Sequence, residues 1–121
     1  MMLANTMPKI KAIKQPIPIL LAAGMSQRMG GLNKLLLPIN GVPMVRRMAL
    51  TLAAFADVPT VVVLGHEAQR VAAVLDGIAL TIITNVQYQS GQMSSVTAGL
   101  IAAGQATDYM ICLADLPLLT T

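Results

Sequence analysis

Two cations stand in a glycine-rich stretch of the chain, LLAAGMSQRMGGLNKLLLP, which covers residues 20–38. Arg28 and Lys34 have no acidic residue anywhere in the first 56 positions to neutralise them. An arginine offers a forked donor for phosphate oxygens, and a lysine offers a mobile point charge. Small residues in such a loop let the backbone approach a ligand and form a concave nest for anions. These small residues are Gly24, Ser26, Gly30 and Gly31. The stretch therefore predicts a cradle for a polyphosphate.

The two common phosphate-binding fingerprints are absent from this stretch. The dinucleotide pattern G-x-G-x-x-G fails because Met25 and Ser26 follow Gly24. The P-loop pattern G-x-x-x-x-G-K-[ST] fails because Lys34 does not directly follow a glycine. The alternative without a ligand is a glycine-rich turn whose two long cationic side chains extend into solvent.

The charge is divided unevenly along the 121 residues, although the net value is only +3. Seven of the eight basic residues lie within positions 1–56, whereas all five acidic residues lie within positions 57–121. A cationic half favours a phosphate-bearing partner, unless its first three lysines belong to a solvated tail. Nucleic acid is a poor candidate because aromatic residues, on which bases stack, make up 2% of the chain.

The single cysteine and the hydropathy pattern bear on the compartment. Cys112 has no partner for an intrachain disulfide, and its apolar neighbours predict a core residue in a reducing, cytoplasmic protein. A catalytic thiol is the less favoured alternative, since it would need His66, the single histidine. The basic, apolar N-terminus resembles a secretory signal, but its apolar run is short and contains Pro16 and Pro18. No run reaches the roughly 18–20 apolar residues of a membrane span, so we expect no membrane association.

Strands and helices alternate in the predicted element order. Four apolar runs predict strands over residues 17–22, 60–65, 79–84 and 109–115. The stretches between them predict a helix after a turn at 40–43, a second over 66–77 and a third over 93–104. The expected core-facing positions are Met44, Met48, Leu52 and Phe55 in the first helix, Ala68, Val71, Ala72 and Leu75 in the second, and Val96, Leu100 and Ile101 in the third. Residues 24–33 and 85–92 are expected to be loops.

Continuous apolar strands indicate a sheet whose two faces are both covered by helices. With right-handed crossovers, this order predicts an α/β fold, a Rossmann-like three-layer α/β/α arrangement with a mostly parallel sheet. Residues 1–15 are expected to be a tail, and residues 16–121 the folded part. Ligands of such sheets bind at the carboxyl ends of the strands, where the glycine-rich stretch would lie.

The segment LAAGMSQRMGGLNKLLLP resembles the signature L-A-A-G-x-S-x-R-M-G-x-x-x-K-L-L-L-P of the MobA-like nucleotidyltransferases. Within that family, the chain is most similar to the molybdenum cofactor cytidylyltransferases. The resemblance continues through GVPMVRR, VVVLGHEAQRV, TNVQYQSGQMSSVTAGLIAA and DYMICLADLPLLT, and so covers nearly everything after residue 16.

The resemblance implies a nucleotide-diphospho-sugar transferase type of fold and a nucleotidyl transfer. The expected reaction moves a nucleoside monophosphate from a nucleoside triphosphate, preferably CTP, to a molybdopterin-type acceptor, with release of pyrophosphate and with Mg²⁺ as cofactor. Arg28 and Lys34 match the cations that grip the triphosphate, and Asp115 matches the metal-binding aspartate. The positions that match nucleotide-binding segments are Leu21, Ala22, Ala23 and Gly24, together with Ser26 and Gly30, at the strand end and loop, and Gly91, Ser94 and Ser95 near the base and ribose.

The family's domain is longer than this chain, so the resemblance implies its N-terminal, nucleotide-binding part, C-terminally truncated. We therefore expect self-association through an uncovered strand edge, and no transfer activity from these 121 residues alone. Two alternatives stay open: a nucleotidyltransferase of the same fold that acts on a sugar phosphate or an isoprenoid precursor, and a non-catalytic nucleotide-binding module. Arg46 and Arg47 are expected on a solvated helix face rather than at an acceptor. His66 is expected at the surface or a helix start rather than against a substrate.

Overall fold

The computed structural model describes residues 16–23, 28–29, 32–106 and 108–114. Its centre is a four-stranded parallel sheet with the order β7-β6-β1-β8. The strands are β1 (Ile17–Ala22), β6 (Thr60–Leu64), β7 (Leu80–Thr84) and β8 (Tyr109–Leu113). All four predicted strands are thereby confirmed, with ends that differ from the prediction by two residues or fewer.

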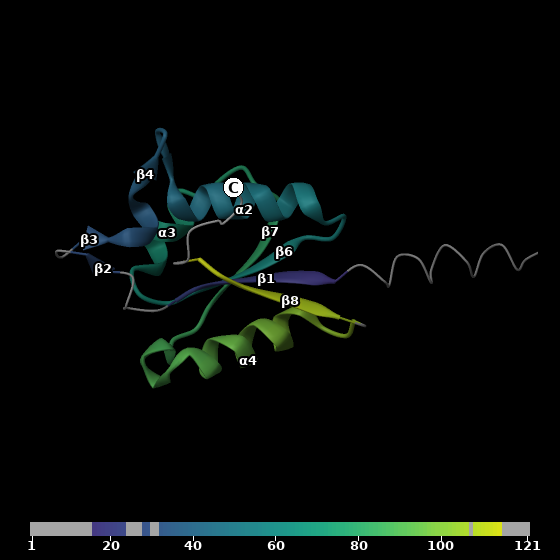
Figure 1. Cartoon of the computed structure of the whole chain (residues 1–121). Coiled ribbons are helices and arrows are strands. Elements are labelled where there is room, and N and C mark those ends of the chain that lie inside the picture. The colour runs from purple at the N-terminus through teal and green to yellow at the C-terminus, as the bar shows by residue number, and fades with distance from the viewer. Residues whose placement is uncertain (1–15, 24–27, 30–31, 107, 115–121) are drawn as a thin grey trace, which may run out of the picture.

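Helices cover both faces of the sheet, which confirms the three-layer α/β/α prediction (Figure 1). Helices α2 (Met44–Phe55) and α3 (Ala68–Ala73) lie on one face, and α4 (Gln92–Ala103) lies on the other. Helix α3 is shorter than the predicted 66–77. Its end tightens into turns with i to i+3 hydrogen bonds, such as Leu75 N to Ala72 O at 3.0 Å.

The residues of β1 alternate between two apolar clusters, one on each side of the sheet. Leu20 and Ala22 pack with α2 and α3, whereas Ile19 and Leu21 pack under α4. This division explains why the strand is apolar at every position, since both of its faces are buried.

The packing of α4 corrects the predicted core face of this helix. Leu100 is 36% exposed and Ile101 is 76% exposed, whereas Ser95 and Gly99 are buried against the sheet. A Cβ atom built on Gly99 would lie 2.6 Å from Ile19 Cγ2. Small residues therefore set the close distance between α4 and β1, and the large aliphatic side chains are left on the outside.

The predicted core stripe of α2 is confirmed at its two central positions only, because Met44 is half-buried and is not part of the buried face of the helix. Met48 and Leu52 are buried, but Phe55 is 52% exposed. Phe55 ends the helix, and the following Ala56 occupies the buried position beside it.

Short hairpins precede α2, in a region where the sequence predicted a loop over 24–33. Strands β2 (Arg28–Met29) and β3 (Leu32–Asn33) pair antiparallel, and the short 3₁₀ helix η1 (Lys34–Leu36) follows them. Strands β4 (Pro38–Ile39) and β5 (Val42–Pro43) form a second hairpin. Its turn places Asn40 at φ 55° and Gly41 at φ 82°, as an Asn-Gly hairpin requires, and this confirms the turn predicted at 40–43.

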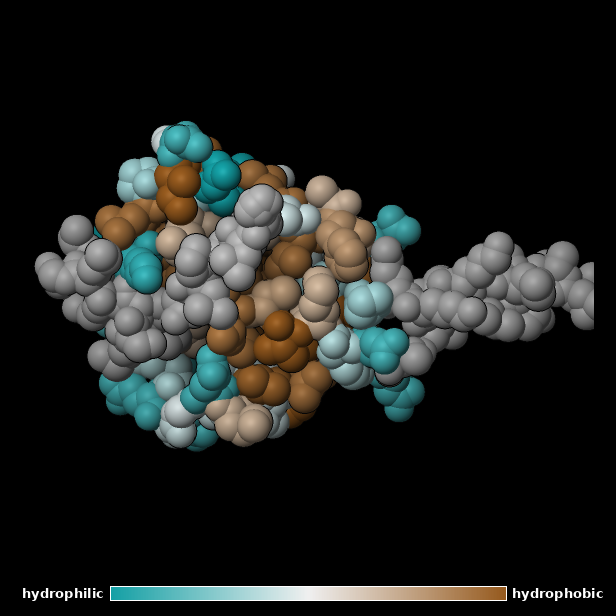
Figure 2. Space-filling model, in the orientation of Figure 1, coloured by the Kyte–Doolittle hydropathy of each residue, from teal (hydrophilic) through white to brown (hydrophobic). Residues whose placement is uncertain are grey.

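Apolar side chains gather on the surface over β8 and the neighbouring helix α4 (Figure 2). Ile111 of β8 is 41% exposed, and β8 pairs on one side only within the described part of the sheet. Among the described residues, no helix has the length and apolar character to cross a membrane.

Candidate functional site

The candidate site lies at the carboxyl edge of the sheet. There the four strands end beside the β2–β3 hairpin and the first turn of α4 (Figure 1). Backbone hydrogen bonds join the residues that follow the strands: His66 N to Ala23 O at 3.2 Å, Asn85 N to Leu64 O at 2.7 Å, and Ala114 N to Leu21 O at 3.0 Å. These bonds hold the exits of β6, β7 and β8 against their neighbours along one edge.

The strand-end residues of β1 present backbone rather than side chains. The side chains of Leu21, Ala22 and Ala23 are all buried in the two apolar clusters. A nucleotide at this edge would therefore meet main-chain atoms here, which is what their predicted role requires. Gly24, Ser26, Gly30 and Asp115 lie outside the described residues, and their predicted roles stay predictions.

Lys34 opens η1 directly after the β2–β3 hairpin and is partly exposed. Arg28 stands opposite Asn33 in the hairpin register, so the backbone brings the positions of the two predicted cations close together. Within the described residues, the ion pairs involve Glu67 with His66 and with Arg70, and none involves Lys34. Buried Leu35 follows Lys34 and anchors the turn in the core.

Gly91 stands at the N-cap of α4 with φ 116°, a backbone conformation that side chains other than glycine rarely adopt. Its exposed position ends the loop after β7 and begins a helix of 12 residues. The first N–H groups of such a helix, together with its dipole, favour a nearby anion. The geometry is thus compatible with the predicted place of Gly91 beside a nucleotide.

Asn85 connects the end of β7 to the first turn of α4. Its Nδ2 donates to Ser94 Oγ at 2.8 Å and to Ser95 Oγ at 3.0 Å, and its Oδ1 accepts from Gln87 N at 3.0 Å. Ser94 Oγ also donates to Gly91 O at 2.8 Å. The two serines therefore shape the loop that carries Gly91. Asn85 was not among the predicted site residues. The available signal was its place directly after a predicted strand, at the carboxyl edge of the sheet.

Gly65 allows the loops after β1, β6 and β7 to meet. A Cβ atom built on it would lie 2.6 Å from Tyr88 Cβ and 2.8 Å from both Ala23 Cβ and Ala23 O. His66 follows it, with its ring centroid 6.1 Å from that of Tyr88. The His66 side chain is mostly buried, and it lies just before the start of α3, which confirms the helix-start alternative of its prediction.

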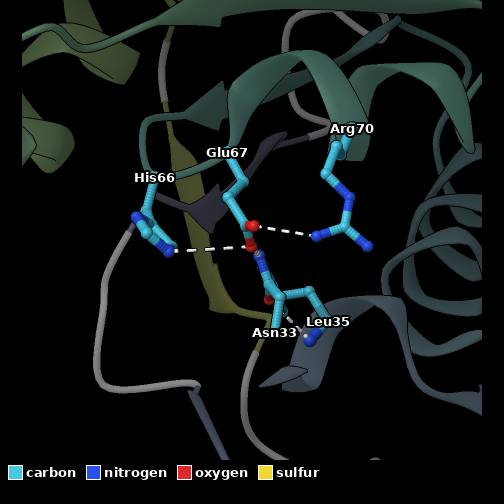
Figure 3. A network of polar contacts seen from close by, with 5 residues as sticks. All are labelled: Asn33, Leu35, His66, Glu67 and Arg70. Atoms are coloured by element: carbon cyan, nitrogen blue, oxygen red, sulfur yellow. Dashed lines mark hydrogen bonds and ion pairs between the residues drawn. The ribbon is translucent and has the colours of Figure 1, made fainter. Parts of the chain in front are cut away.

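A polar cluster joins the β2–β3 hairpin to the start of α3 (Figure 3). Asn33 Nδ2 donates to Glu67 Oε1 at 3.0 Å, and Arg70 Nη1 donates to Glu67 Oε2 at 2.8 Å. The hydrogen bond from Asn33 is the main cause that lowers the pKa of Glu67 below 4.5, and Arg70 adds to it. Neither Asn33 nor Glu67 was among the predicted site residues. They stand 34 positions apart, and the only sequence signal for either was its place next to Lys34 or His66.

Arg46 has a structural contact that the sequence did not predict. Its Nη1 donates to Val74 O at 3.0 Å and to Asp76 O at 2.8 Å, so it binds free carbonyls at the end of α3. The prediction of a solvated helix face is therefore wrong for Arg46. The Arg47 carbonyl accepts from Thr51 Oγ1 at 2.9 Å, and within the described ranges the Arg47 side chain itself forms no hydrogen bond or ion pair.

Arg46→Ala is expected to lower the free energy of unfolding by about 1 kcal/mol, because two carbonyls lose a charged donor. Arg47→Ala, one position along the same helix, should change it by less than about 0.5 kcal/mol. Urea unfolding of the two variants beside the wild type measures the difference. Equal stabilities for both variants would contradict this role of Arg46.

Cys112 is a free thiol on β8 and is partly buried. Burial raises its pKa above the ordinary value of 9.0, so little thiolate forms at neutral pH. A weakly ionised thiol is a poor nucleophile, which agrees with its predicted place among core residues.

Metal binding at this edge would have to involve a carboxylate and the ligand's own oxygens. Within the described residues, no three His, Cys, Asp or Glu side chains gather into a metal-binding group. Mg²⁺ is commonly held by one or two carboxylates plus substrate phosphates, so such a group is not required. The buried Ala114, bonded to the end of β1, brings the chain to this edge just before Asp115. The donor chemistry of Asp115 fits Mg²⁺.

Comparisons with known proteins agree with the fold. A family model described as the MobA-like NTP transferase domain matches residues 18–121. A nicotine blue oxidoreductase from Paenarthrobacter nicotinovorans is 36% identical over 99 residues, which cover 82% of this chain and 48% of that protein. A probable molybdenum cofactor guanylyltransferase from Natronomonas pharaonis is 32% identical over 102 residues, with 84% and 50% coverage.

A solved structure is similar as well. It is a nucleotidyl transferase from Methanothermobacter thermautotroptrophicus. The two superpose with a TM-score of 0.72 at 28% identity, over 87% of this chain and 52% of that one. The chain spans about half the length of the two curated relatives, 48% and 50%. The matched range and the shared architecture show that the chain belongs to the MobA-like NTP transferases, a family of nucleotidyltransferases.

Proposed function

We propose that the chain provides the nucleotide-binding part of an Mg²⁺-dependent nucleotidyltransferase, with CTP as nucleotide and a molybdopterin-type compound as acceptor. One observation carries the proposal: Lys34 lies at the carboxyl edge of the sheet, beside the Arg28 position, and has no ion-pair partner among the described residues. A triphosphate is the counter-charge that fits two neighbouring cations at a backbone-lined edge.

In the proposed reaction, a phosphate oxygen of the acceptor attacks the α-phosphorus of the nucleotide. The bond from that phosphorus to the bridging oxygen breaks, and pyrophosphate leaves with the negative charge. Lys34 and Arg28 stabilise this developing charge, so catalysis consists of positioning and electrostatics. Asp115 would hold Mg²⁺, which when bound neutralises phosphate charge and orients the phosphates. No covalent intermediate with the protein is required.

A titration with nucleotides tests the proposal. CTP, GTP and UTP are each added to the chain with and without Mg²⁺, and binding is followed by calorimetry. We expect Mg²⁺-dependent binding that is tightest for CTP. GTP is the main competitor, because one relative is named a guanylyltransferase. Tighter binding of GTP would replace CTP in the proposal, and no binding of any nucleotide at millimolar concentration would contradict it altogether.

A redox function is the second candidate, and it is favoured by the relative named nicotine blue oxidoreductase. Hydride donors such as reduced nicotinamide cofactors are usually bound through the G-x-G-x-x-G fingerprint, which this chain lacks. Reduced nicotinamide cofactors therefore belong in the same titration. Binding of such a cofactor in preference to every nucleoside triphosphate would favour this candidate.

Self-association through the outer edge of β8 is a further part of the proposal. Within the described part of the sheet the outer edge of β8 has no partner strand, and such an edge with an exposed apolar residue, Ile111, favours pairing with a second copy. At micromolar concentration, light scattering should report a dimer or a larger species. Ile111→Lys should shift the population toward monomer, whereas Thr81→Lys on the opposite edge strand β7 should not. A monodisperse wild-type monomer would contradict this expectation.

A further inference from the structure

The bond between Asn33 and Glu67 crosses between two strand-exit segments of the fold (Figure 3). Asn33 ends the β2–β3 hairpin after β1, and Glu67 lies between β6 and α3. The asparagine is 5% exposed and the Glu67 side chain is 23% exposed, so their 3.0 Å bond is partly shielded from water. A shielded hydrogen bond to an ionised carboxylate is among the stronger polar contacts in a protein.

The second bond of Asn33 fixes the turn that carries Lys34. Asn33 Oδ1 accepts from Leu35 N at 3.0 Å and so caps the 3₁₀ helix that Lys34 opens. Arg28 faces Asn33 in the hairpin register. One buried amide therefore connects the backbone positions of both predicted phosphate-binding cations to the exit of β6.

Glu67 is held in place from its own side. Its backbone adopts φ 55° and ψ 39°, a left-handed conformation that is uncommon for residues other than glycine and persists when surrounding contacts support it. Arg70 Nη1 binds its second oxygen at 2.8 Å. Asn33 and Arg70 thus satisfy both carboxylate oxygens, and among the described residues Glu67 forms no ion pair with Lys34.

We propose that Asn33 and Glu67 act as a positioning pair that holds Lys34 and the β2–β3 hairpin at the carboxyl edge, in place to receive the phosphates of a nucleotide. This inference rests on the proposed function. Neither side chain has to touch the nucleotide, because the pair acts through the backbone on either side of Lys34.

The affinity for CTP with Mg²⁺ tests the pair in four proteins: the wild type, Asn33→Asp, Asn33→Asp with Glu67→Gln, and Gln69→Ala. Asn33→Asp keeps the acceptor for Leu35 N but sets a second carboxylate against Glu67. We expect it to weaken binding roughly 10-fold, the scale of a small misplacement of a binding group. Adding Glu67→Gln restores the hydrogen bond in the opposite direction, with the amide at position 67 as donor and the carboxylate at position 33 as acceptor. The affinity should then return to within about 3-fold of the wild type. Gln69→Ala, an exposed change on α3, should leave it unchanged.

Thermal unfolding of each protein is recorded in parallel, and binding is measured at a temperature where all are folded. If Asn33→Asp does not fold, Asn33→Ser replaces it, since serine keeps a capping oxygen and removes the amide donor. A wild type that binds no nucleotide would overturn the proposed function and this inference with it. A wild type that binds, beside an Asn33 variant of equal affinity or a double variant without recovery, would overturn the positioning pair alone.

Discussion

Replacing Lys34 with alanine is expected to lower the rate of nucleotidyl transfer on the order of 10²- to 10³-fold, the usual loss when one charge-stabilising donor is removed. The rate is to be measured in a form of the protein long enough to bind the acceptor, because the chain covers about half of the curated relatives' length, 48% and 50%. Lys34 forms no ion pair within the described residues, so its loss should leave the unfolding temperature nearly unchanged. The effect should therefore appear in turnover and not in stability.

Two control variants make this result specific. Lys34→Arg keeps the charge but changes its shape and reach, so it should recover part of the lost rate. Arg47→Ala removes an equal charge from α2, where Arg47 is expected on a solvated helix face, and should leave the rate near that of the wild type. Near-normal turnover in Lys34→Ala, or equal losses in Lys34→Ala and Arg47→Ala, would contradict the role of Lys34.

Replacing Gly65 with alanine is expected to destabilise the fold by about 2–3 kcal/mol, as overpacking at a rigid contact does. The added methyl group would stand 2.8 Å from the carbonyl oxygen of Ala23 and 2.6 Å from Tyr88 Cβ. Relief requires movement of backbone at the exits of β1 and β6, because neither contact is the end of a flexible side chain. The variant should therefore also weaken nucleotide binding at this edge.

Gly41→Ala provides the contrast for the Gly65 variant. Gly41 has a left-handed φ of 82° but no atom within 4 Å of an added Cβ. Backbone strain alone should then cost about 1 kcal/mol. Urea unfolding of the two variants separates steric overlap from strain. A Gly65→Ala protein as stable as the wild type would show that the three loops do not meet as tightly as described.

Strand positions could be predicted because β1 is apolar at every position and β6 at every position after Thr60, a pattern that follows directly from burial on both faces. The core face of α4 could not be predicted in this way. Gly99 faces Ile19 at a distance that only a small residue permits, so packing distance outweighed the apolar character of Leu100 and Ile101. A hydropathy pattern predicts that large apolar residues face the core, whereas at this helix–sheet contact the small residues Ser95 and Gly99 do so.

The residues of the candidate site also fall into those that a local sequence pattern predicted and those that only the fold brings together. Lys34 and Gly91 were each predicted from a local pattern and from the resemblance that it carries, and their roles toward a nucleotide stay predictions. Asn33 and Glu67 stand 34 positions apart and come together only when β1 and β6 pair, so no local sequence pattern predicts their contact. Arg46 was misjudged for the same reason, since its carbonyl partners lie just after α3, 28 and 30 positions along the chain.

A nucleotide site at the carboxyl edge is tested most directly by finding where a nucleotide binds on the sheet. Backbone amide chemical shifts, recorded by NMR while CTP and Mg²⁺ are added, report this residue by residue. The largest changes are expected at the carboxyl edge, at Ala23, Lys34 and Gly91, and little change is expected at Thr60 and Leu80, where β6 and β7 begin. Changes centred on those strand beginnings, or none at saturating nucleotide, would contradict a nucleotide site at the carboxyl edge.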